Sequence, residues 1–134
     1  MKKILLAILT GVSIASCTKT ISTPSGVANQ NVFFKDADVI VENMVAVPTT
    51  NSSITINFST KFENNISRIE LMSSATASTF CTTQAIDVTG NSSVKKNYSF
   101  NDSNLKGNIM YYLLRFKNNN GDWSYSPYVS VKAN

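Results

Sequence analysis

Few residues of this chain are of the types that usually perform catalysis or bind metal ions. The 134 residues include no histidine, so the most frequent general base and the most frequent metal ligand are both absent. The five aspartates and three glutamates are scattered, and no pair has a spacing that suggests general acid–base chemistry. We therefore expect a protein that is not an enzyme and has no catalytic residues, no metal site and no cofactor.

One segment has the oxygen-rich composition of the start of a calcium-binding loop, namely Asn118-Asn119-Asn120-Gly121-Asp122. Such a loop has a glutamate six residues after its glycine, and Pro127 stands at that place here. Asparagine and glycine tolerate positive φ angles, which tight hairpin turns require. The segment therefore predicts a hairpin turn rather than a metal site.

Aromatic residues near the end of the chain are the candidates for ligand binding. Trp123, Tyr125, Tyr128 and Tyr111 fall on two neighbouring predicted strands, and strand alternation cannot bury all four. Exposed flat rings suit sugar faces or the hot spots of protein interfaces. The alternative is structural, with Trp123 and Tyr125 covering the hairpin end of a small domain.

The N-terminal residues have the pattern of a secretory signal peptide. Lys2 and Lys3 give a positive start, and residues 4–14 form an almost unbroken apolar run. Eleven residues are too few to span a bilayer, which needs about 20. Small residues follow the run, as they do before a signal-peptide cleavage site. We predict that residues 1–16 are a signal peptide.

The sequence Ile14-Ala15-Ser16-Cys17 resembles the lipobox of bacterial lipoproteins. The resemblance implies that the Cys17 thiol takes a diacylglycerol, that the signal is cut before it, and that the new amine is acylated, for example by palmitate. Two or three acyl chains would anchor the protein to a membrane firmly without spanning it. The alternative is an ordinary signal peptide with an incidental cysteine.

The lipobox resemblance also implies a location in the bacterial cell envelope, at the outer membrane. In bacteria whose lipoproteins reach the cell surface, an acidic run just after the cysteine is the family's export signal. No such run follows Cys17, so the resemblance favours the periplasmic face over the cell surface. Removal of Lys2 and Lys3 with the signal lowers the net charge from +4 to about +2. A nucleic-acid partner is therefore not expected.

Cys81 is the second of the two cysteines. If Cys17 is acylated, Cys81 has no partner within the chain. It follows Phe80 and has no basic neighbour that would lower its pKa, so we expect a buried and inert thiol. A reactive thiol is the alternative.

The rest of the chain predicts a tether followed by an all-β domain. Residues 17–35 are mostly Thr, Ser, Pro, Gly, Asn and Gln, a composition typical of a flexible spacer. Residues 36–134 show period-two alternation with turn residues at regular spacing, which predicts a seven-stranded antiparallel β-sandwich. The expected strands are at 39–47, 53–59, 67–72, 79–88, 96–100, 109–117 and 123–132.

Two groups of segments in this domain resemble known families. The C-terminal part resembles a fibronectin type III-like module, through Asn104-Leu105-Lys106-Gly107, Tyr111-Tyr112-Leu113-Leu114-Arg115-Phe116, Asn120-Gly121-Asp122, Tyr125-Ser126-Pro127 and Val129-Ser130-Val131. A closer similarity is to the sandwich domain that precedes the sorting tail of type IX-secreted proteins, with the additional segments Phe58-Ser59-Thr60, Glu63-Asn64-Asn65 and Tyr98-Ser99-Phe100-Asn101-Asp102.

That similarity covers about residues 39–132 and has three departures. Phe58 stands where tryptophan is usual, Leu113 stands where arginine is usual, and Gly121-Asp122 reverses the usual order. The resemblance implies a fold rather than a ligand, because folds of this class host many unrelated functions.

Alternation along the predicted strand 109–117 separates two faces. Tyr112, Leu114 and Phe116 share one face, which we assign to the core, and Tyr111 lies on the other. A tyrosine near the start of this strand often bonds upstream backbone in sandwich domains, and we assign that role to Tyr112.

The sequence as a whole indicates a membrane-anchored, non-enzymatic module that binds a protein partner or acts as a scaffold in the envelope. The alternative is a carbohydrate-binding accessory lipoprotein that uses Trp123, Tyr125, Tyr128 and Tyr111. Both readings use the same exposed aromatic side chains.

Overall fold

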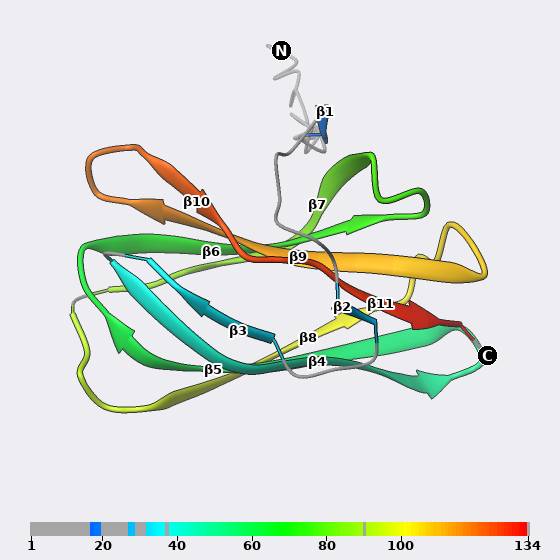
Figure 1. Cartoon of the computed structure of the whole chain (residues 1–134), viewed down its shortest axis with the longest axis horizontal. Helices are drawn as coiled ribbons and strands as arrows, with labels where there is room; N and C mark the ends of the chain where they lie inside the picture. Colours follow the sequence, from blue (N-terminus) through cyan, green and yellow to red (C-terminus); the bar gives the residue numbers. More distant parts are fainter. Residues whose placement is uncertain (1–16, 20–26, 29–31, 37, 90, 134) are drawn as a thin grey trace, which may run out of the picture.

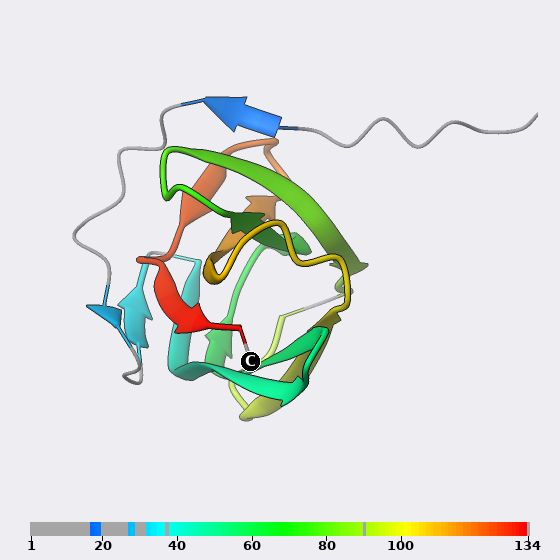
Figure 2. The ribbon, with the colours of Figure 1, turned by 90° about the vertical axis from the view of Figure 1, so that its right-hand side faces the viewer.

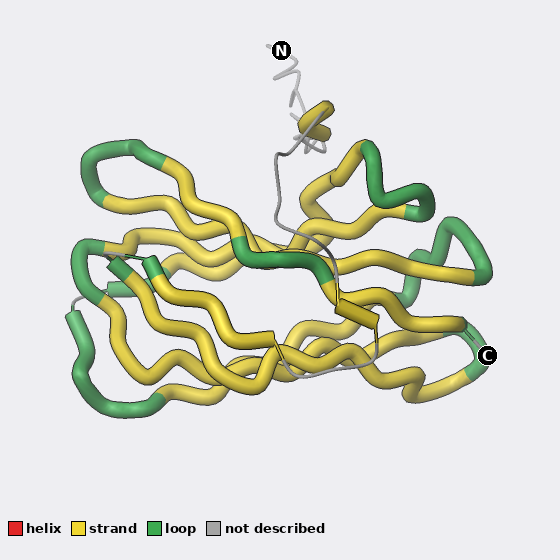
Figure 3. The backbone as a smooth tube through the Cα atoms, in the orientation of Figure 1, coloured by secondary structure: helices red, strands yellow, loops and turns green. Residues whose placement is uncertain are grey.

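The computed structural model of the chain describes residues 17–19, 27–28, 32–36, 38–89 and 91–133, so the predicted signal peptide lies outside the described residues (Figure 1). The described residues form strands and turns, and no helix (Figure 3). Accordingly, none of them belongs to a helix long and apolar enough to cross a membrane.

The strands form two sheets that pack face to face (Figures 1 and 2). The larger sheet contains, in spatial order, β1 (Cys17–Lys19), β7 (Thr79–Asp87), β6 (Ile66–Ser74), β9 (Ile109–Asn118), β11 (Val129–Lys132) and β2 (Val27–Ala28), and β10 (Trp123–Tyr125) also pairs with β9. The smaller sheet contains β3 (Val32–Lys35), β4 (Val39–Thr50), β5 (Ser53–Glu63) and β8 (Lys96–Asp102). All pairings are antiparallel except that of β2 with β11.

The predicted all-β, sandwich-like fold is confirmed, but the strand count is different. From residue 39 onward the structure has eight strands, β4–β11, where the sequence predicts seven. The predicted last strand is divided in two, because Pro127 has no N–H for a ladder and Ser126 instead bonds β9 through its backbone and hydroxyl. β10 therefore pairs with one end of β9 and β11 with the other.

Three short strands lie within residues 17–35, the segment predicted as a tether. β1 pairs with β7, β2 with β11, and β3 with β4. Each of them lies at the edge of a sheet, where unpaired backbone N–H and C=O groups are available. The polar composition of this segment gave no sign of strands at residues 17–19 and 27–28.

The main core lies between the sheets and follows the predicted alternation. On β9 the inward residues Tyr112, Leu114 and Phe116 are fully buried, as predicted. Each buried side chain of this size contributes roughly 1.5–3 kcal/mol. The smaller sheet supplies the opposite wall, mainly through Val39, Val41, Met44, Ala46, Ile54, Ile56, Phe58 and Phe100.

The predicted hairpin turn at residues 118–122 is confirmed. Gly121 has a φ of 91°, and its N–H donates to the carbonyl of Asn118 at 3.0 Å. The Asn118 side-chain oxygen accepts from the backbone N–H groups of Asn120 and Asp122. The Asn118 Oδ1 atom therefore stabilises the turn through two hydrogen bonds.

Tyr112 has the predicted core position but a different hydrogen-bond partner. Its hydroxyl donates to Asp102 Oδ2 at 2.9 Å, so the acceptor is a side chain on β8 rather than upstream backbone. The second carboxylate oxygen of Asp102 accepts from the backbone N–H of Asn104 at 2.9 Å. Burial and the neighbouring carboxylate raise the pKa of Tyr112, so the hydroxyl stays a donor. This bond ties the two sheets together.

Replacing Tyr112 by Phe should lower the free energy of unfolding by about 2 kcal/mol, because a buried carboxylate loses one donor. The measurement is urea unfolding at neutral pH. The control is Tyr128→Phe, since the Tyr128 ring is only partly buried and its hydroxyl has no hydrogen bond among the described residues. Equal effects of the two changes would contradict the role of the Tyr112–Asp102 bond.

Candidate binding face on the larger sheet

All four aromatic residues singled out in the sequence lie on the outer face of the larger sheet. Tyr111 projects from β9 on the side opposite the core, and its ring contacts that of Tyr128 edge-on at 5.5 Å between centroids. Trp123 and Tyr125 lie on β10, opposite Lys117 and Arg115 of β9. Trp123 is 36% exposed, and the three tyrosines are half-buried. The structure thus brings the predicted ligand-binding residues onto one surface.

The tyrosines cover a second, small hydrophobic cluster. Met72, Phe80 and Leu113 are almost completely buried although they face away from the main core. The ring of Phe80 lies 6.2 Å from that of Tyr128. We call this region the tyrosine patch: Tyr111, Tyr125 and Tyr128 over Met72, Phe80 and Leu113.

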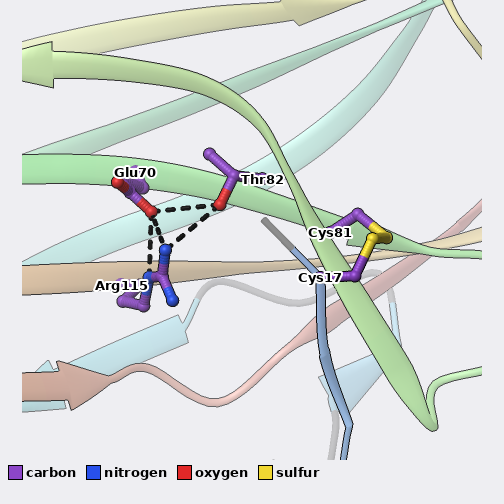
Figure 4. Close-up of a disulfide and its surroundings, with 5 residues drawn as sticks. All are labelled: Cys17, Glu70, Cys81, Thr82 and Arg115. Atoms are coloured by element: carbon purple, nitrogen blue, oxygen red, sulfur yellow. Dashed lines mark hydrogen bonds and ion pairs between the residues drawn. A yellow bond between two sulfur atoms is a disulfide. The ribbon is translucent and has the colours of Figure 1, made fainter. Parts of the chain in front are cut away.

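Beside the tyrosine patch, a buried carboxylate holds two arginines. Glu70 on β6 lies directly opposite Arg115 on β9, and Glu70 Oε2 accepts from Arg115 Nε at 2.9 Å and from Arg115 Nη2 (Figure 4). Glu70 Oε1 accepts from Arg68 Nε at 2.8 Å, and the Thr82 hydroxyl donates to Oε2 at 3.1 Å. Arg68 Nη1 also donates to Asp87 Oδ1 at 2.7 Å.

These contacts determine the charge state of Glu70. Burial alone would raise its pKa, but the hydrogen bonds from Arg68 and Arg115 outweigh burial and hold the pKa below its ordinary value. The hydrogen bond to Glu70, with a further one to Asp87, raises the pKa of Arg68. At neutral pH the Glu70 carboxylate and the Arg68 guanidinium are therefore both ionised.

Trp123 rests on this network. The guanidinium carbon of Arg115 lies 4.0 Å from the centroid of the Trp123 ring, and Lys117 Nζ lies 5.5 Å from it. Such cation–π contacts fix the ring at the surface without burying it. The outer face is hollowed here into an open depression of about 370 Å³, which we call the Trp123 depression, lined by Ser67, Arg68, Glu70, Asp87, Lys117 and Trp123.

The charged side chains of this face are held in place by hydrogen bonds and ion pairs with one another. The Glu70 carboxylate accepts from both arginines and Thr82, so it is not placed as a base with free lone pairs. Within the described residues, no three histidine, cysteine, aspartate or glutamate side chains are grouped for a metal ion. An aromatic plane beside fixed charges suits a bound ligand or partner.

Sequence reasoning did not single out Glu70, Arg115, Met72 or Phe80 as candidate binding residues. Alternation does place Leu113 and Arg115 on the face opposite Tyr112, which was the available signal. It does not give the register that sets Glu70 opposite Arg115, or the fact that both are buried at 5–6% exposure.

The expectation that Cys81 lacks a partner and is buried is wrong for this structure. Cys81 is half-exposed and forms a disulfide with Cys17, across the antiparallel pair of β1 and β7 (Figure 4). The expectation followed from assigning Cys17 to a lipid, which leaves Cys81 alone. The register of β1 on β7 places the two cysteines directly opposite each other. One sulfur cannot be both a thioether and half of a disulfide, so the two states of Cys17 exclude each other.

Comparison with known proteins gives no further guide. No family model, no curated protein and no solved structure matches the chain.

Replacing Glu70 by Gln should lower the free energy of unfolding by about 3 kcal/mol at neutral pH, because the buried Arg115 guanidinium loses its charged partner. The pKa of Glu70 is lowered by folding, so its carboxylate stabilises the fold above the ordinary value of 4.5 and stops doing so as the pH falls through the folded-state pKa. The difference between variant and parent should therefore shrink on acidification.

Urea unfolding from neutral pH down to about pH 3 measures this difference. Asp87→Asn is the control, because the Asp87 side chain is 75% exposed and its ion pair with Arg68 contributes at most about 1 kcal/mol. A Glu70→Gln effect that does not change with pH would contradict the assignment.

Proposed function

We propose that this protein is a lipid-anchored lipoprotein of a bacterial cell envelope that acts as a non-enzymatic protein-interaction or scaffolding module. Cys17 is the acylated residue in this proposal, the sandwich is fibronectin type III-like, and the outer face of the larger sheet is the binding surface. The observation that carries it is the tyrosine patch, an aromatic surface on the solvent side of a sheet.

The composition of the outer face supports a protein partner. Tyrosine, tryptophan and arginine are the residues enriched at interface hot spots, and here they are adjacent. Charged side chains such as Arg68, Asp87 and Lys117 lie to one side of the tyrosines. An apolar centre with a polar margin is the usual anatomy of a specific protein interface.

Two features of the sheets agree with a fibronectin type III-like assignment. Tyr112 on β9 is buried and bonded across the sandwich, and the hairpin of β9 and β10 follows it. The last strand is interrupted at Ser126-Pro127, within the segment that carries the resemblance. An arrangement of two packed antiparallel sheets is compatible with this family and with others.

The lipid anchor is supported by the lipobox resemblance and by the exposure of Cys17 in the structure. Acylation would remove Cys17 from the disulfide and leave Cys81 as a free thiol. The membrane in question is the outer membrane, with the periplasmic face favoured by the absence of acidic residues just after Cys17.

Carbohydrate binding is the second candidate, and the Trp123 depression favours it. A sugar ring could stack on the exposed face of Trp123 while its hydroxyls meet Arg68, Asp87 and Lys117, which line the same hollow. This function would depend on Trp123 and not on Tyr128.

Membrane-bound protein isolated from a bacterial host should carry a thioether-linked diacylglycerol on Cys17 and a free thiol on Cys81. Mass spectrometry of the N-terminal peptide, with alkylation of free thiols before digestion, measures both. Cys17→Ser should release the protein from the membrane, whereas Cys81→Ser should leave it there. Membrane-associated protein that contains the intact Cys17–Cys81 disulfide would contradict the lipid anchor.

Crosslinking in living cells, followed by affinity recovery, should yield a reproducible envelope protein that is lost when Tyr128 is replaced by Ala. The change removes a ring that covers Phe80 and contacts Tyr111, so we expect at least about a tenfold loss in binding. The control is Val94→Ala, because Val94 is 72% exposed and belongs to neither the tyrosine patch nor the Trp123 depression.

The same experiment separates the two candidate functions. Recovery of glycan rather than protein, abolished by Trp123→Ala and unaffected by Tyr128→Ala, would replace the first candidate by the second. Recovery of neither class, from cells in which the protein is folded and anchored, would contradict both.

A further inference from the structure

A second hollow lies away from the outer face, at one end of the sandwich. It is a cleft of about 460 Å³ between β7, β8 and the segment that follows β8, which we call the end cleft. Its volume falls within the roughly 300–1,000 Å³ that is typical of small-molecule sites. β6, β7 and β8 all contribute to its walls, so both sheets hold it in place.

Most residues that line the end cleft have polar side chains, although apolar atoms make up the larger part of its surface. Leu71 is the last core residue of β6 and Phe100 is the last core residue of β8, and two positions further along these strands stand Ser73 and Asp102. Strand alternation directs all four inward. The end cleft therefore borders the hydrophobic core, and β6 and β8 place a hydroxyl and a carboxylate group at that border.

Ser73 has an unused hydroxyl at this place. The residue is only 7% exposed, lines the end cleft, and forms no side-chain hydrogen bond within the part of the chain that the structure describes. A buried polar group without a partner costs free energy, and native structures have few of them. A ligand in the end cleft would supply the missing partner.

The charges that line the end cleft are few. Asp102 already accepts from the Tyr112 hydroxyl and from the backbone N–H of Asn104. Lys106 is the single cation among the lining residues and is exposed. The remaining lining groups are neutral, mostly hydroxyls and amides: Ser74, Ala75, Thr79, Thr82, Thr83, Gln84, Asn101, Ser103, Asn104 and the sulfurs of Cys17 and Cys81.

The side-chain amide of Gln84 links two walls of the end cleft. Gln84 on β7 accepts a hydrogen bond through Oε1 from the backbone N–H of Asn101 on β8 at 3.1 Å. This bond joins the edges of the two sheets beside the end cleft, so the neighbouring polar groups are held in position before any ligand arrives. Preorganised groups of this kind increase affinity because little ordering is needed on binding.

We infer that the end cleft binds a neutral, hydroxyl-rich ligand of the size of one or two sugar rings, with the Ser73 hydroxyl as a hydrogen-bond partner. Hydroxyl and amide side chains match such a ligand, whereas a strongly charged ligand would find only Lys106 as a free counter-charge. The apolar atoms of Ala75 and of the Cys17–Cys81 disulfide offer contacts for the C–H groups of the ring. The site lies apart from the tyrosine patch and from Trp123, although Thr82 lines it and also donates to Glu70 on the outer face. The contacts with the disulfide exist only in protein whose Cys17 is not acylated, whereas Ser73 is present in both forms.

The test is a titration of the purified, isotope-labelled protein with four sugars: D-glucose, D-galactose, N-acetyl-D-glucosamine and cellobiose. The readout is the change in backbone amide NMR chemical shifts. At least one sugar should shift the backbone amides of Ser73, Thr79 and Asn104 in a saturable manner. Ser73→Ala should weaken that binding roughly fivefold to tenfold, since one hydrogen bond to a neutral group is lost.

The same variant distinguishes a binding role from a structural one. Because the Ser73 hydroxyl has no partner in the described residues, Ser73→Ala should be at least as stable as the parent protein. The matched control is Ser130→Ala, a half-buried serine of β11 outside the end cleft, which should leave sugar binding unchanged.

Three outcomes would overturn the inference. The first is the absence of saturable shifts around the end cleft with every sugar tested. The second is sugar-dependent shifts confined to Trp123 and its neighbours, which would place the sugar on the outer face. The third is a large loss of stability in Ser73→Ala with unchanged affinity, which would make Ser73 a structural residue.

Discussion

The carboxylate of Glu70 is a buried charge, and burial of a charge is costly unless every lone pair is used. Here the cost is offset by Arg68 on one oxygen, and by Arg115 and Thr82 on the other. These donors come from β6, β7 and β9, so the carboxylate fixes the relative position of three neighbouring strands. The arrangement of the outer face follows from it, because Arg115 lies directly under Trp123.

Strand β9 is buried on both of its faces and so contributes to the main core and to the outer face of the larger sheet. Its inward residues complete the main core, and its outward residues Leu113 and Arg115 are buried under the tyrosine patch and the Trp123 ring. A strand with one solvated face would carry a polar residue at the position of Leu113. The apolar run of this strand thus reports two covered faces, and the cover on the outer side is made of aromatic side chains that remain partly accessible.

The sequence predicts the parts of this arrangement that depend on local pattern, and not the parts that depend on register. Alternation is local, so the core face of β9 and the turn at Gly121 follow from the residues themselves. The common face of the four aromatics does not, because alternation along one continuous strand would place Tyr125 and Tyr128 on opposite faces, and the interruption between β10 and β11 brings them together. The pairing of Glu70 with Arg115 joins residues 45 positions apart, and no local pattern specifies it. Pro127 is visible in the sequence, but only the paired structure shows that it divides the last strand.

The sequence assigns a lipid to Cys17, whereas the structure assigns it a disulfide with Cys81. The position of Cys81 on β7 determines which part of the molecule this difference affects. Neighbouring residues of β7 serve opposite sides of the larger sheet: Phe80 belongs to the tyrosine patch, and Cys81 lines the end cleft. Because the disulfide lies on the Cys81 side, its presence or absence alters the border of the end cleft. The Glu70 network and Trp123 take their contacts from β6, β7, β9 and β10, without a residue of β1. The Glu70 network and the Trp123 ring therefore have the same contacts whether Cys17 carries a lipid or a disulfide.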